Sequence, residues 1–158
     1  MTRDIDLFFE SIRKTDKYRL EALLRINPKL VDTKDLRGFT PLIFATYFDN
    51  EIVANILIKH NADINAKDSL GNTALIGVSF KGNATLVTLL IEQGADINAT
   101  NNNGATALIF ATQYDKKTIV KQLLDAGADK SIKDGEGKMA YDYALEKEFN
   151  HLFILLKD

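Results

Sequence analysis

The chain has 158 residues, of which 46% are hydrophobic and 27% charged, and its nine glycines and two prolines argue against a disordered chain. The net charge of −2, from 20 Lys and Arg against 22 Asp and Glu, argues against a nucleic-acid partner, because phosphate binding needs an excess of cations. The absence of cysteine excludes disulfides, thiolate metal ligands and a cysteine nucleophile.

No apolar run reaches the ~18 residues that a membrane span needs. At the N-terminus, Asp4 and Asp6 stand where a signal peptide would have its basic region and apolar core. We therefore expect an intracellular, cytoplasmic protein that has no membrane partner.

Glycines at a fixed spacing of 33 residues reveal an internal repeat: Gly38, Gly71, Gly104 and Gly137. An acidic or amide residue stands three positions before each glycine, and a threonine stands two positions after each of the first three. So many positions in register exclude chance. The period divides the chain into successive units at 1–34, 35–67, 68–100, 101–133 and 134–158.

The first unit, residues 1–34, lacks both the glycine and the threonine of the pattern. Terminal units of repeat proteins are expected to be irregular and to carry a polar outer face. We therefore predict an N-terminal cap. Apolar residues at helical spacing form its predicted inner face: Ile5, Leu7, Phe8 and Ile12.

Each of the three middle units has the pattern of a turn followed by two short helices. In residues 35–67, Asp35 and Gly38 predict a tight turn, because Asp bonds nearby backbone amides and Gly accepts a positive φ. Thr40 then predicts a helix N-cap, with Pro41 at the first helical position. A residue in the left-handed conformation is expected to end each second helix: Asn61, Gly94 and Gly127.

The last unit, residues 134–158, has Met139 where the other units have the capping threonine. Apolar residues predict a final amphipathic helix that closes the array as a C-terminal cap: Phe149, Leu152, Phe153, Leu155 and Leu156.

Two motifs together resemble the ankyrin repeat: Asp35-x-x-Gly38-x-Thr40-Pro41-Leu42 and Asn-Ala-Asp-Ile-Asn at 61–65. The resemblance covers residues 35–158 directly and 1–34 more loosely. It implies an all-α solenoid of stacked helix-turn-helix units with β-turn fingers, as a single ankyrin-repeat domain over 1–158. The chain departs from the family where a histidine usually follows the Thr-Pro-Leu motif, so apolar packing is expected to replace the histidine's hydrogen bonds at Ile43, Ile76 and Ile109.

Several patterns that imitate chemical sites have a simpler structural explanation. Residues 135–140 match the Gly-x-Gly-x-x-Ala of a dinucleotide loop, but they are in phase with the other turns and follow no buried strand. The aspartates that recur once per unit are expected to bond local backbone amides rather than a metal: Asp63, Asp96 and Asp129. His60 and His151 are expected to have no Ser or Asp partner. We therefore predict a protein that is not an enzyme and has no catalytic residue, metal or cofactor.

In ankyrin arrays the partner usually meets the concave side, formed by the finger tips and the exposed ends of the first helices. The residues that the 33-residue period places at these positions form a predicted protein-binding patch: Leu36, Arg37, Phe39, Tyr47, Phe48, Leu70, Phe80, Lys81 and Tyr114. The packing of one repeat on the next does not require so many aromatic residues at these positions. Exposed aromatic residues are typical of interaction sites. Two or three of the large side chains are expected to fold into the groove, whereas Phe44 and Phe110 are expected in the core.

The leading hypothesis is a non-catalytic protein–protein interaction module that binds a partner protein. One alternative is an inhibitor or immunity-type protein that neutralises a specific enzyme or toxin, and another is a self-associating structural protein. We expect a monomer, with a homodimer as the open alternative. The units differ in charge, from about +2 in residues 1–34 to about −3 in residues 134–158, and such a field could orient a partner.

Overall fold

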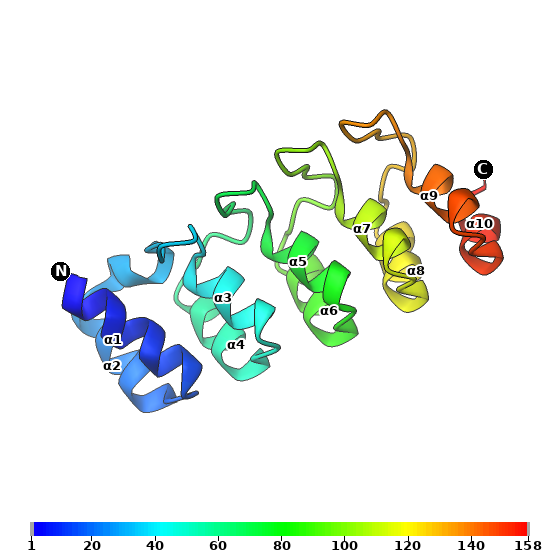
Figure 1. The fold of residues 1–158 in the computed structure, drawn as a ribbon. Coiled ribbons are helices and arrows are strands. Elements are labelled where there is room, and N and C mark those ends of the chain that lie inside the picture. Colours follow the sequence, from blue (N-terminus) through cyan, green and yellow to red (C-terminus); the bar gives the residue numbers. More distant parts are fainter. Residues whose placement is uncertain (1, 158) are drawn as a thin grey trace.

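The computed structural model describes residues 2–157, and every regular element in that range is helical (Figure 1). Met1 and Asp158, the ends of the predicted domain, lie outside the described residues. The helices, with η1 a 3₁₀-helix, are α1 (Thr2–Arg13), α2 (Lys17–Ile26), η1 (Pro28–Asp32), α3 (Pro41–Tyr47), α4 (Glu51–Lys59), α5 (Ala74–Lys81), α6 (Ala84–Glu92), α7 (Ala107–Gln113), α8 (Lys117–Asp125), α9 (Ala140–Glu146) and α10 (Asn150–Leu156).

The helices form antiparallel pairs that stand side by side in one row, from the N-terminal pair in blue to the C-terminal pair in red (Figure 1). The loops before α5, α7 and α9 project from the same side of this row as fingers. The structure thus confirms the predicted all-α solenoid of helix-turn-helix units. Each pair lies within one 33-residue period, and the boundaries between units stay a prediction.

Threonine caps start the first helices of the middle units, as predicted. The hydroxyl of Thr40 accepts a hydrogen bond from the Ile43 amide at 3.2 Å, and Thr73 and Thr106 do the same in their units. At Met139 the threonine is missing, and the Asp142 carboxylate instead accepts a hydrogen bond from the Met139 amide at 2.8 Å. A single local bond therefore sets the start of each of these helices.

The predicted turns and helix ends are also confirmed. The Asp35 carboxylate accepts hydrogen bonds from the amides of Arg37 and Phe39, both at 2.9 Å. Gly38 follows at a φ of +77°. The residues that end the second helices are likewise left-handed: Asn61, Gly94 and Gly127.

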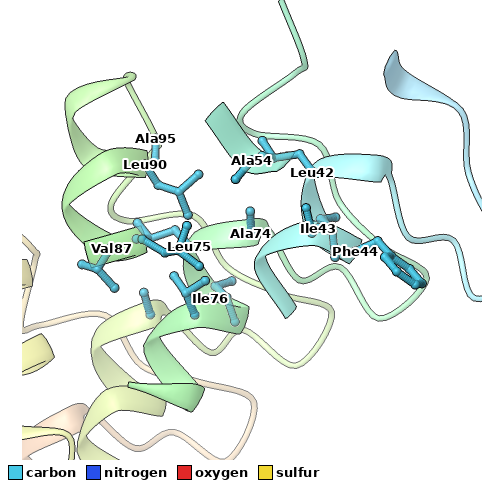
Figure 2. Packing of buried hydrophobic residues seen from close by; sticks show 14 of the residues in the cluster. Leu42, Ile43, Phe44, Ala54, Ala74, Leu75, Ile76, Val87, Leu90 and Ala95 are labelled. Atoms are coloured by element: carbon cyan, nitrogen blue, oxygen red, sulfur yellow. The ribbon is translucent and has the colours of Figure 1, made fainter. Parts of the chain in front are cut away.

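Rows of leucine and isoleucine residues are buried within the units and between them. Leu42, Leu75 and Leu108 are buried, and so are the isoleucines that replace the usual histidines. Figure 2 shows Ile43 and Ala74 between α3 and α5, and Leu75 beside α6. Apolar packing does take the place of the histidine hydrogen bonds here.

The N-terminal cap corrects one prediction. Phe8 and Ile12 are buried, and Ile5 packs against the core, but Leu7 is not part of the core cluster. Phe9 takes that place, with its ring 5.4 Å from that of Phe44. The buried stripe follows the helical spacing of positions 5, 8, 9 and 12, which leaves position 7 outside it.

Candidate protein-binding surface

The ends of the first helices place aromatic residues in a row beside the fingers. Tyr47 is the last residue of α3, and Phe48 caps it. Phe80 lies in the last turn of α5, and Tyr114 caps α7. Because each helix stops after about two turns, these side chains leave the stack at equivalent places one period apart.

Most of the predicted patch is exposed. The exposed large residues are Leu36, Tyr47, Phe48, Leu70, Phe80 and Tyr114. Phe39 is half-buried and packs against the core, so one of the seven large side chains folds in rather than the expected two or three. Phe44 is buried as predicted, whereas Phe110 is only half-buried, although it packs against the core.

The exposed aromatic rings contact one another in two groups, edge to face or tilted. In the first group, the Tyr47 ring lies 5.6 Å from Phe39 and 5.2 Å from Phe48. In the second, Phe80 and Tyr114 meet edge to face at 4.5 Å. Such contacts restrict the rings before any partner arrives, which lowers the entropy cost of binding.

Arg37 is held at the edge of the first aromatic group. Its guanidinium donates to the Asp35 carboxylate at 2.9 Å and lies 4.4 Å from the centre of the Phe39 ring. The cation is thus fixed in place while half of its side chain stays accessible.

Lys81, which the sequence places on the same patch, is a brace between units. Its ammonium donates to the carbonyl oxygen of Tyr47 at 2.5 Å and pairs with the Asp49 carboxylate at 2.8 Å. Burial alone would raise the pKa of Asp49, but hydrogen bonds from Lys81 and Asn83 outweigh burial and lower that pKa below its ordinary value. The charge of Lys81 is therefore largely engaged within the chain.

Three hollows are lined by residues of the fingers together with residues of the first helices. The N-terminal hollow, of about 650 Å³, lies between α1 and the finger at 35–37. The anchor hollow, of about 280 Å³, lies between α3, α5 and the finger at 68–72, with Gly77 in its wall. The C-terminal hollow, of about 480 Å³, is lined by residues of the fingers at 101–105 and 134–136. Sequence reasoning missed Gly77, although it is a glycine in the interior of α5.

His151 does have an acidic partner, so that prediction was wrong. Its Nε2 lies 2.5 Å from Oδ1 of Asp115, in the turn between α7 and α8. The pair lines none of the three hollows, and both side chains are exposed. It acts as a brace between α10 and the preceding unit.

The other patterns that imitate chemical sites are turns. Asp63, Asp96 and Asp129 each accept a hydrogen bond from the amide two residues later, as predicted. The 135–140 segment forms the same turn as the other fingers, with Gly137 left-handed. Within residues 2–157, no three His, Cys, Asp or Glu side chains are grouped to hold a metal ion. No helix in that part of the chain is both long and apolar enough to cross a membrane.

A model of ankyrin repeats (3 copies) matches residues 10–101 and 75–158, which together cover nearly the whole chain. No curated protein matches the sequence.

Proposed function

Because the chain belongs to the ankyrin repeat family, we propose that it is a non-catalytic module that holds a partner protein against its fingers and first helices. Ankyrin repeats generally mediate protein–protein interaction. The observation that carries the proposal is the row of exposed aromatic residues, in edge-to-face contact with one another, beside three hollows. Aromatic side chains of this kind dominate the energetics of protein interfaces.

In this proposal the chain is a monomer, and its row of exposed aromatic residues contacts a different protein. A homodimer through the same row would bury the same residues. Light scattering at two concentrations separates the two, since a constant monomer mass leaves the row free for a partner.

The position of the partner can be tested by site-specific cross-linking in extracts of the source cells. A photo-reactive phenylalanine replaces Phe48 in one variant and Tyr18 in another. Tyr18 is a matched control, because it is an exposed aromatic on the second helix of its unit. The proposal predicts one cross-linked protein from position 48 and none from position 18, and the reverse pattern would refute it.

A further inference from the structure

We infer that the anchor hollow receives one aromatic side chain of the partner, from a segment that carries an acidic group toward α1 and a basic group toward α9. This inference rests on the proposed function and gives the partner a definite chemistry.

The hollow exists because one helix lacks an aromatic residue that its neighbours have. The positions equivalent to Gly77 in the first helices of the units at 35–67, 101–133 and 134–158 hold Phe44 in α3, Phe110 in α7 and Tyr143 in α9. A Cβ built on Gly77 would meet no heavy atom within 4 Å, and its φ is not in the left-handed region. The missing side chain therefore leaves open space between two helices, α3 and α7, that both have an aromatic residue at this position.

The residues that line the anchor hollow suit it to an aromatic side chain. Aromatic and aliphatic carbon borders it on several sides, from Phe39, Tyr47, Leu70, Phe80 and Phe110. Its volume of about 280 Å³ is slightly below the ~300–1,000 Å³ of typical small-molecule sites. One large side chain suits it better than a cofactor does.

The polar groups in the wall already have partners within the chain. The Thr73 hydroxyl caps the Ile76 amide, and the Thr46 hydroxyl donates to the Leu42 carbonyl at 2.9 Å. The Asp68 carboxylate accepts bonds from its own turn. The two hydroxyls and Oδ1 of Asp68 are thus engaged within the chain, and most of the remaining wall is aromatic or aliphatic, so the site favours a mainly apolar side chain.

The hollows on either side differ in charge. The N-terminal hollow is lined by three cations and two carboxylates: Arg13, Lys34, Arg37, Asp6 and Asp35. The charged groups of the C-terminal hollow are the carboxylates Asp134 and Glu136, and Lys138 offsets one of them at 3.4 Å from Glu136. A partner segment that crosses all three hollows therefore complements these charges when it carries an acidic group at the N-terminal hollow and a basic group at the C-terminal hollow.

The test is selection from a phage-displayed library of random linear peptides on the full chain. Gly77→Phe fills the hollow from within by copying the neighbouring units, and Gly77→Ala is the matched control that leaves most of it open.

The selected peptides should contain an aromatic residue between an acidic and a basic one. They should bind Gly77→Ala like the original chain and Gly77→Phe at least about tenfold more weakly, as expected when one buried apolar side chain is displaced. Selection on Arg13→Glu should remove the preference for the acidic residue.

Other outcomes separate this inference from the proposed function. Peptides that bind Gly77→Phe normally but bind Phe48→Ser or Tyr114→Ser weakly would overturn the anchor site and keep the binding face. An empty selection, or peptides that bind every variant equally, would count against both. If Gly77→Phe does not fold, NMR of the original chain replaces it. The inference predicts that the Gly77 amide resonance shifts when a selected peptide binds, and an unchanged resonance would contradict it.

Discussion

The ring of Phe110 in α7 borders the space that Gly77 leaves open in α5, one period earlier in the sequence. The equivalent Phe44 is buried, with only 2% of its surface exposed, because Phe9 of the cap packs on it. Phe110 has no aromatic neighbour of this kind at position 77, which explains why it is only half-buried. One missing side chain thus changes the burial of a residue in the next unit.

Gly77→Ala should stabilise the protein by roughly 0.5–1 kcal/mol, because glycine in a helix interior costs about that much relative to alanine. The added Cβ meets nothing, so no clash opposes the gain. Urea unfolding measures the change. Gly94→Ala is the matched control, since its Cβ is equally unobstructed but its φ is +85°, and it should destabilise. Two substitutions with the same sign would contradict this explanation.

Thr73→Ala should cost about 1 kcal/mol of unfolding free energy, because the amide of Ile76 loses its cap inside the stack. Thr73→Ser keeps the hydroxyl and should lose clearly less. Thermal unfolding of both variants compares them, and an equal loss would show that packing of the methyl group, rather than the cap, matters at this position.

Asp134 and Tyr143 give the last unit a defined dependence on pH. Burial would raise the pKa of Asp134, but hydrogen bonds from the Tyr143 hydroxyl at 2.5 Å and from the amides of Lys138 and Glu136 outweigh it, so the pKa is lowered. A lowered pKa in the folded state stabilises the protein above the ordinary pKa of an aspartate, and this contribution disappears as pH falls through the folded value.

Tyr143→Phe should therefore be less stable than the original chain at neutral pH. The two should converge in acid, as Asp134 becomes protonated in the folded state. Burial, followed by the bond to Asp134, raises the pKa of Tyr143 to about 12, so the advantage should also shrink as alkaline pH approaches that value. Urea unfolding across the pH range checks this, and a difference that does not vary with pH would refute the coupling.

Lys81→Met should lower stability by up to about 1 kcal/mol, because a partly exposed ion pair and a bond to the Tyr47 carbonyl are lost. Lys59→Met is the control, since Lys59 is an exposed lysine at the end of α4. Chemical denaturation compares the two. A variant that loses partner affinity at unchanged stability would instead assign Lys81 to the interface.

Features set by a few neighbouring residues were predictable from the sequence. The caps at Thr40 and its equivalents, and the left-handed ends at Asn61 and Gly94, depend on local hydrogen bonds and on backbone sterics alone. Leu7 was misassigned because the first unit departs from the repeat pattern, so no register guided the choice of face.

Contacts between units were harder to predict. Asp115 and His151 are 36 residues apart, three more than the period, so the repeat frame does not align them. The anchor hollow could have been predicted from the sequence, because Gly77 stands where both neighbouring units have an aromatic residue. Its depth, however, depends on how the Leu70 finger and the ring of Phe80 enclose it, and this follows only from the packed structure.

The dissociation constant of the cross-linked partner tests the central claim most directly. Phe48→Ser combined with Tyr114→Ser removes one ring from each aromatic group, and Tyr18→Ser combined with Ile154→Ser removes exposed apolar side chains from second helices. Calorimetry should show at least about a tenfold weaker affinity for the first pair and an unchanged affinity for the second. Equal losses in both variants, or a loss confined to the second, would contradict binding at the fingers and first helices.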